Sequence, residues 1–442
     1  MVSTKSETLT QRKRMRGVIV AALSASTLEW YDFYIYGTAA ALVFNEVFFP
    51  NVDATVGTLA AFATFGVGFL FRPLGGIIFG HFGDTRGRKT LLVIAMILMG
   101  SATFLIGVLP TYEMVGIAAP ILLVVLRALQ GIAVGGQYGG AMLLVTENAP
   151  AHKRGFYGSF SHIGPSLAVI LSNIVFLVVV ATVDSAALQA WAWRIPFLLS
   201  ALVVAAGLYM QLKLEDTAEF TAMRAKQQAE GSTSEKAPRR GRSPIIEALV
   251  THPKQLLQAG GMILVVQVYY YVLIVFTISY ATSNGISRST VLMTVLASSA
   301  VTVVSIPYFA ALSDRVGRKK VLLAAAIATT LTAFPFVLLL ASGSVALLAI
   351  GVVVPGLTLG ALYGPMAAFY YEMFSAEIRY SGASIGYQLG AVVGGGFAPL
   401  IATTLLAATG TILSVGAYIV VAGLISIWAI ASTKASRASS QS

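Results

Sequence analysis

The chain has 442 residues, of which 57% are hydrophobic and 11% are charged, and its mean hydropathy is +0.81. Because a soluble domain carries about 25% charged residues, this composition excludes a water-soluble fold. The chain contains no cysteine, which excludes disulfides and thiolate metal sites. A formal charge of +11 would fit nucleic-acid binding, but the distribution of the basic residues argues against it.

Apolar stretches long enough to span the hydrocarbon core of a bilayer as a helix follow one another along the whole chain. They are continuous and do not alternate with period two, which excludes a transmembrane β-barrel. We therefore predict an all-α membrane protein with twelve transmembrane helices. The predicted spans are residues 17–42, 57–80, 90–109, 117–146, 155–182, 192–212, 254–283, 290–313, 319–341, 345–374, 380–408 and 411–432.

The basic residues predict the orientation of these helices. Five of them precede the first span without a cleavage pattern, so we expect that span to be retained as a helix. With a cytoplasmic N-terminus, 25 of the 29 Lys and Arg residues lie in inner loops and tails, whereas two, Arg194 and Arg288, lie outside. This imbalance follows the positive-inside rule. It predicts a multi-pass protein of the cytoplasmic membrane with both termini in the cytoplasm.

Four ionisable residues lie in the middle of predicted first-half helices: Glu29, Asp32, Arg72 and Arg127. A charge at the centre of a spanning helix costs about 2.5–3.5 kcal/mol on insertion scales, so such residues need partners and usually have a function. Glu29 and Asp32 share a helix face, with Tyr36 one turn further on. We predict that Asp32, with Glu29, takes up and releases a proton, while Arg72 and Arg127 remain charged. Structural salt bridges are the alternative.

Two loops repeat in sequence. Residues 80–89, GHFGDTRGRK, recur at 310–319 as AALSDRVGRK, in each case after the second helix of a half. Tight helix connections need glycine, and an aspartate at a helix edge can pair with basic groups or a helix terminus. We predict that these loops latch the two halves together; a topological anchor is the alternative. The predicted gate residues are Asp84, Arg88, Asp314 and Arg318.

A second repeat follows the fourth helix of each half. Glu147 and Arg154 are echoed by Glu372 and Arg379, and we assign all four to the same gates. Between the halves, residues 213–254 carry eight basic and six acidic residues with few apolar ones, a composition that cannot bury a core. We therefore divide the chain into a first half at 1–212, a cytoplasmic linker at 213–253 and a second half at 254–442.

The second half is predicted to lack buried charge, because the repeat places Met262 and Val352 at the positions of Asp32 and Arg127. Its helices carry tyrosines and glutamines that can donate to and accept from solute hydroxyls. For any one tyrosine, a core or interfacial aromatic is the alternative. The candidate substrate-binding residues here are Gln267, Tyr270, Tyr363, Tyr387 and Gln388, with Tyr269, Tyr271, Tyr370 and Tyr371 as further members of a polar wall.

The repeated loops resemble those of the major facilitator superfamily, and the likeness covers nearly the whole chain. Within it, residues 28–37 (LEWYDFYIYG), 71–76 (FRPLGG) and 135–141 (GGQYGGA) resemble the metabolite:proton symporter family. That family includes permeases for shikimate, α-ketoglutarate, citrate and proline or betaine. Residues 57–72 and 380–388 are similar to its shikimate permeases in particular. Thr85 and Gln137 depart from the family pattern, which usually has an arginine and an acidic residue there.

The resemblance implies a major facilitator fold of two six-helix halves. Residues 127–131, RALQG, resemble the fourth-helix motif in which the arginine is linked to proton coupling. Arg127 could hold a substrate carboxylate as a bidentate pair or act as counter-ion to Asp32. The first-half candidates for substrate binding are Arg72, Arg127, Tyr36, Gln130, Gln137 and Tyr138.

The resulting hypothesis is proton-coupled uptake of a small organic acid, such as shikimate or another hydroxy, aromatic or dicarboxylic acid, by alternating access. The alternative is proton-coupled efflux of amphiphilic compounds, which an incomplete glycine pattern around Gly164 and Pro165 disfavours. A receptor that binds without turnover is a third possibility. No enzyme motif occurs in a suitable context, so we expect no catalytic residue, cofactor or metal. The expected partners are the solute, protons and the lipid bilayer, with a monomeric protein and no nucleic acid.

Overall fold

The computed structural model describes residues 2–86, 88–135, 145–146, 149–202, 204–205, 250–374 and 379–433. Within these ranges every element is a helix, which confirms the predicted all-α class. Nine of the described helices are long and apolar enough to cross a membrane, and two shorter apolar helices, Val93–Gly107 and Ala192–Leu202, join them. With the first helix, these give the twelve predicted spans.

The first half of the chain forms six spans, several of them built from two consecutive helices. Their apolar residues are buried against one another, and the large aromatic residues of the first helix are among the most buried side chains. The elements are α1 (Val2–Leu42), α2 (Phe44–Phe48), α3 (Ala54–Leu70), α4 (Arg72–Arg86), α5 (Arg88–Gly107), α6 (Tyr112–Val115), α7 (Ala118–Gly135), η1 (Ala151–Lys153), α9 (Arg154–Gly158), α10 (Phe160–Thr182), α11 (Ser185–Ala190) and η2 (Ala192–Arg194).

The second half begins at Pro253 and forms six further spans. Two of these contain a π-helical turn, a feature that often marks a functional site. The elements are α15 (Pro253–Tyr271), π-turn η3 (Val272–Phe276), α16 (Thr277–Ser283), α17 (Arg288–Val316), α18 (Arg318–Leu331), α19 (Ala333–Leu340), α20 (Val345–Met373), α21 (Arg379–Ala391), π-turn η4 (Val392–Gly396), α22 (Ala398–Thr409) and α23 (Leu413–Ser432). The predicted linker at 213–253 lies outside the described residues except for its last four positions.

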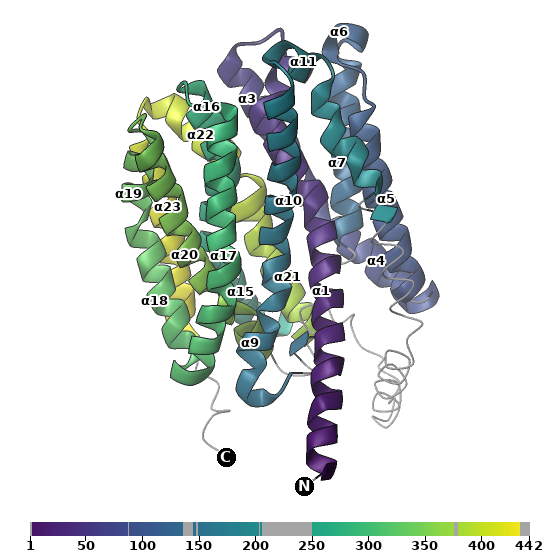
Figure 1. The fold of residues 1–442 in the computed structure, drawn as a ribbon, viewed down its shortest axis with the longest axis vertical. Coiled ribbons are helices and arrows are strands. Elements are labelled where there is room, and N and C mark those ends of the chain that lie inside the picture. Colours follow the sequence, from purple (N-terminus) through teal and green to yellow (C-terminus); the bar gives the residue numbers. More distant parts are fainter. Residues whose placement is uncertain are drawn as a thin grey trace.

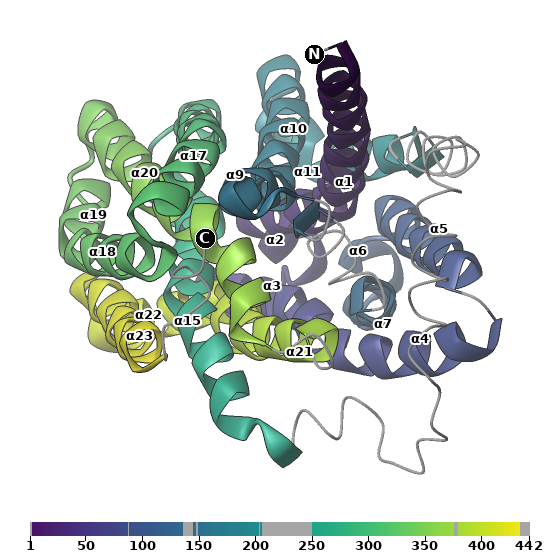
Figure 2. The same cartoon turned by 90° about the horizontal axis from the view of Figure 1, so that it is seen from below.

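The helices run roughly along one direction and gather into two groups. Seen from the lower end, α18, α19, α20 and α23 lie on one side and α1, α4, α5 and α7 on the other (Figure 2). Helix α10 packs along α17, and α3 packs against η4 and α22, so these contacts join the halves. Helix α1 also contacts η3 and α16 of the second half.

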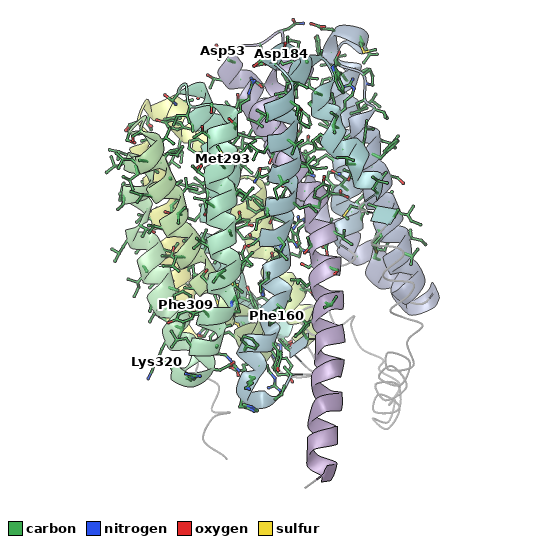
Figure 3. The ribbon with its side chains drawn as sticks, in the orientation of Figure 1. Asp53, Phe160, Asp184, Met293, Phe309 and Lys320 are labelled. Carbon is green, nitrogen blue, oxygen red and sulfur yellow. The ribbon has the colours of Figure 1, made fainter. Side chains whose placement is uncertain are left out.

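The two ends of the bundle differ in charge. Helix α1 begins at the lower end (Figure 1), and Lys320 lies at that end, whereas Asp53 and Asp184 lie at the other (Figure 3). We call the lower end, which also carries Arg154 and Lys319, the basic end. Lys319 fixes the end of α23 there by donating from Nζ to the carbonyl oxygen of Ala431, 2.8 Å away.

Candidate functional site

Three helices bring the four ionisable residues that were predicted to lie inside the membrane into one layer. Helix α1 carries Glu29 and Asp32, α4 begins with Arg72, and α7 carries Arg127. The side chains of Asp32, Arg72 and Arg127 are completely shielded from solvent. The sequence predicted these positions as intramembrane charges, and the structure places all four together.

Glycines allow the helices that carry the two arginines to approach closely. A Cβ atom at Gly68 would lie 2.7 Å from Nε of Arg127, and a Cβ atom at Gly131 would meet the backbone of α3. Gly135 likewise lies against the backbone of Arg72. Because only glycine fits such approaches, this crossing of α3 and α4 with α7 sets how close the two guanidinium groups come.

Each arginine has an acidic neighbour on α1. Asp32 lies within electrostatic reach of Arg127 and beside Thr103 of α5, and Glu29 lies within reach of Arg72. Arg127 also donates from Nη1 to Oε1 of Gln130, 2.9 Å away. Both ends of the Gln130 amide are therefore engaged, since its Nε2 donates to Thr103 Oγ1 at 2.6 Å.

Aromatic rings enclose both guanidinium groups. The Cζ atom of Arg72 lies 4.3 Å from the ring centroid of Phe33 and 3.9 Å from that of Phe69. The Cζ atom of Arg127 lies 4.1 Å from the centroids of both Phe33 and Tyr36. Such cation–π contacts are strongest when the cation is desolvated. Phe33 thus contacts both arginines, a role that the sequence analysis did not assign to it.

Several polar atoms in this layer have no hydrogen-bond partner among the described residues. They include all three guanidinium nitrogens of Arg72, Nε and Nη2 of Arg127, both carboxylate oxygens of Asp32 and Oε1 of Glu29. Buried polar groups are nearly always satisfied in proteins, so an orphaned cluster needs an explanation. A polar ligand that takes the free donors of Arg72 would supply one.

Tyrosines of the second half face this layer. The ring of Tyr34 on α1 lies 6.1 Å from that of Tyr270 and 6.3 Å from that of Tyr271, centroid to centroid. Tyr270 in turn lies 5.8 Å from Tyr363 of α20, which contacts the ring of His162 at 5.5 Å. Four further polar atoms are buried without a hydrogen-bond partner in the described part of the chain: the hydroxyls of Tyr270 and Tyr271, Nε2 of Gln267 and Oε1 of Gln388.

Other tyrosines of the expected polar wall are engaged in helix packing. Tyr269 donates its hydroxyl to the carbonyl oxygen of Thr332 at 3.2 Å, and Tyr370 donates to that of Ala259 at 2.6 Å. The hydroxyl of Tyr36 donates to Oγ1 of Thr64 at 2.6 Å. The ring of Tyr36, and not its hydroxyl, therefore contacts Arg127. Tyr387 is buried in α21.

A contact at the basic end joins the two halves. Asp314, in the last turn of α17, accepts hydrogen bonds from the backbone N–H groups of Gly155 and Phe156, each at 2.9 Å. These amides belong to the first turn of α9, where the helix dipole favours a negative charge. The predicted gate aspartate of the second half therefore caps a helix of the first half.

Further charged residues surround this contact, which we call the latch. Arg318 pairs with Asp314 at 3.1 Å and also with Glu372. Arg154 donates to the carbonyl oxygen of Thr146 and places Cζ 4.4 Å from the ring of Tyr371 in the other half. The other predicted residues, Glu147, Gln137 and Tyr138 and the side chains of Asp84, Arg88 and Arg379, lie outside the described part of the structure.

The opposite end is open. A cavity of about 1030 Å³ lies between the halves there, lined by Leu42, Glu46, Asp184, Ser283 and Arg288 among others. Leu42 follows Tyr36 by six residues on α1, a rise of about 9 Å. This vestibule therefore lies above the charged layer, while the latch closes the basic end below it.

The chain is similar in sequence to known membrane transporters. Residues 17–434 match the family model described as sugar (and other) transporter. The shikimate transporter of Escherichia coli K12 is 43% identical over 89% of this chain and 88% of its own. An inner membrane metabolite transport protein of the same strain is 37% identical over 88% of this chain and 87% of its own.

Among solved structures, the proton:xylose symporter XylE bound to 6-bromo-6-deoxy-D-glucose superimposes with a TM-score of 0.72. The superposition covers 95% of each chain at 16% sequence identity. At this level of identity the likeness supports the fold alone.

Proposed function

The chain belongs to the sugar (and other) transporter family of the major facilitator superfamily, and from that premise we propose that it takes up a small organic acid together with protons by alternating access. Its relatives are named transporters and not enzymes, as the sequence motifs predicted. The observation that carries the proposal is the buried guanidinium of Arg72, which has no hydrogen-bond partner among the described residues and shares a layer with Asp32 and Arg127.

The two arginines have different roles in this proposal. Arg127 is held by Gln130 and faces Asp32, which makes it the counter-ion of the proton-carrying group. The guanidinium nitrogens of Arg72 have no hydrogen-bond partner among the described residues, and the planar fork of this side chain matches a carboxylate. Arg72 therefore binds the carboxylate of the substrate, and Asp32, supported by Glu29, carries the proton.

The second half recognises the remainder of the substrate. The unpartnered hydroxyls of Tyr270 and Tyr271 and the amides of Gln267 and Gln388 suit hydroxyl groups on a small ring or chain. Together with one carboxylate site, they favour a hydroxylated monocarboxylic acid. Shikimate is the first compound to test, because the shikimate transporter is similar to this chain over most of its length.

Orientation follows from the basic residues. With 25 of 29 Lys and Arg residues in the inner loops and tails, the basic end faces the cytoplasm. The vestibule then opens to the outside and the latch is the cytoplasmic gate, so the described state has an outward-facing vestibule above a buried charged layer. We propose that residues 1–212 and 254–442 rock against each other as two bodies of one monomer.

Uptake into proteoliposomes tests this function. The purified full chain would be reconstituted and supplied with labelled shikimate, a dicarboxylate or proline, with or without an acidic exterior. We expect shikimate to accumulate when the exterior is acidic and a protonophore to abolish the accumulation. Accumulation that requires a gradient of the opposite sign would favour antiport, and no gradient-driven movement of any acid would refute the proposal.

A further inference from the structure

The charges of the buried layer sum to zero. Among the described residues midway along the first-half helices, the ionisable carboxylates are Glu29 and Asp32, and the guanidinium groups are Arg72 and Arg127. The repeat-related positions in the second half are Met262 and Val352. With both carboxylates ionised, the empty layer carries two negative and two positive charges.

The other titratable groups that face this layer are neutral or lie to one side. They are the phenols of Tyr31, Tyr34 and Tyr36 on α1 and of Tyr270 and Tyr271 on α15, and phenols are uncharged at neutral pH. From α5 the facing side chain is Thr103. His162 of α10 lies against the ring of Tyr363, at the far end of the tyrosine chain from Arg72.

A bound anion would disturb this balance. The side chains of Asp32, Arg72 and Arg127 are shielded from solvent, and an uncompensated charge in such surroundings is strongly unfavourable. A monocarboxylate at Arg72 would leave one net negative charge. One proton on either carboxylate restores neutrality, whereas a dicarboxylate would need two protons.

We propose that the number of protons carried with a substrate equals the net negative charge of that substrate, so that transport moves no net charge across the membrane. This inference rests on the proposed acid uptake and adds its stoichiometry. The inference also assigns Glu29 a part in coupling. Removal of either carboxylate leaves the empty layer with one net positive charge, so this part does not depend on which carboxylate accepts the proton.

Proteoliposomes with separately clamped pH gradient and membrane potential test the stoichiometry. For labelled shikimate we expect the accumulation ratio to change roughly tenfold per pH unit, as one proton requires, and to be unaffected by the potential. A ratio that follows the potential at constant pH would overturn the inference while leaving uptake established. A protein that accumulates no acid under either gradient would instead contradict the proposed function itself.

The Glu29→Gln variant gives a sharper test. Its layer accepts a monoanion without a proton, so accumulation should follow an inside-positive potential and no longer follow the pH gradient. Asp53→Asn is the matched control, because it removes one carboxylate at the exposed cap of α3, where asparagine also caps well, and coupling should stay as in the wild type. Retained pH coupling in Glu29→Gln overturns the inference.

Proton uptake on substrate binding is measured on the wild-type protein, so this test does not require that the Glu29→Gln variant inserts into the membrane. Purified wild-type protein in weak buffer should take up one proton per molecule of shikimate bound, as measured with a pH-sensitive dye. Uptake of no proton, or of two, contradicts charge compensation.

Discussion

Arg72 and Arg127 are identical side chains with different neighbours, and the proposal gives them different roles for that reason. Both are completely buried and both contact the ring of Phe33. Arg127 already donates to Gln130, whereas Arg72 has no hydrogen bond to any described residue. A guanidinium held only by aromatic rings and a nearby acid is oriented but retains free donors, which is the state that a carboxylate-binding group requires before its ligand arrives.

Lysine substitutions separate the two roles. Arg72→Lys keeps the charge but loses the planar two-donor fork, and a charge-assisted hydrogen bond is worth about 1.5–3 kcal/mol. We expect the affinity for shikimate to fall about tenfold to a hundredfold, as measured by calorimetry on the purified protein. Arg127→Lys should change affinity less and disturb coupling more. The reverse ranking would make Arg127 the carboxylate-binding residue.

Asp32→Asn tests the proton carrier. The amide imitates the protonated carboxyl group permanently, so we expect accumulation of shikimate driven by the pH gradient to be lost while exchange of internal for external substrate continues. Shikimate binding should also lose most of its dependence on pH. Both are measured on the same proteoliposome and purified samples. If the variant still concentrates shikimate when the exterior is acidic, Asp32 does not have the assigned role.

The sequence predicted that the charged residues of the candidate site lie inside the membrane, but not what surrounds them. Charges such as Asp32 stand out because they are rare in apolar helices, whereas Phe33 is one aromatic residue among many. Consecutive residues in a helix point about 100° apart, so only the packing decides that Tyr269 reaches Thr332 while Tyr270 and Tyr271 face α1. The sequence signal for Phe33 is that it follows Glu29 by one helical turn, which places the two side chains on the same face of α1.

At the scale of elements, the latch depends on a glycine at the start of α9. Gly155 donates its N–H to Asp314, and a Cβ atom at this position would lie 2.5 Å from Oδ1 of that carboxylate. Alanine would therefore displace Asp314 from the two amides that hold it. The loss of charge-assisted hydrogen bonds, worth about 1.5–3 kcal/mol each, should shift the protein toward the state that is open at the basic end.

Accessibility of an engineered cysteine measures that shift. Ala367 of α20 is buried beside Gly158 of α9, and the chain has no native cysteine, so Ala367→Cys reports opening of the basic end. We expect Gly155→Ala to raise its maleimide labelling rate about tenfold or more. Gly76→Ala is the control, since a Cβ atom there meets only ordinary contacts. Equal labelling in both backgrounds would show that the latch does not hold the gate.

Hydropathy predicted the helices well because a spanning helix needs a long apolar run, which is visible in the sequence. It could not predict the π-turns at Val272–Phe276 and Val392–Gly396, since these change the register of backbone hydrogen bonds and not the composition. The second contains Gly395 and Gly396, which lie against Phe69 of the first half. A close approach between halves thus accompanies the irregular turn.

For the whole molecule, the two halves have unequal roles although their loops repeat. The first half supplies every charge of the buried layer, and the second supplies hydroxyl and amide groups together with Asp314 for the latch. In the proposed mechanism, proton coupling and carboxylate binding reside in the first half, while recognition of the rest of the substrate and closure of the gate require both. Such a division makes the seam between halves the functional surface.

Orientation in the membrane is the remaining property of the whole molecule, and labelling from one side tests it. Ser283 is exposed in the vestibule and Lys320 is exposed at the basic end. Because the basic residues are retained inside, a membrane-impermeant maleimide should label Ser283→Cys in intact cells and Lys320→Cys only after permeabilisation. Reporter fusions in the 213–253 linker and at the C-terminus should both give cytoplasmic signals. The opposite labelling pattern would show that the vestibule faces the cytoplasm and that the described state is inward-facing.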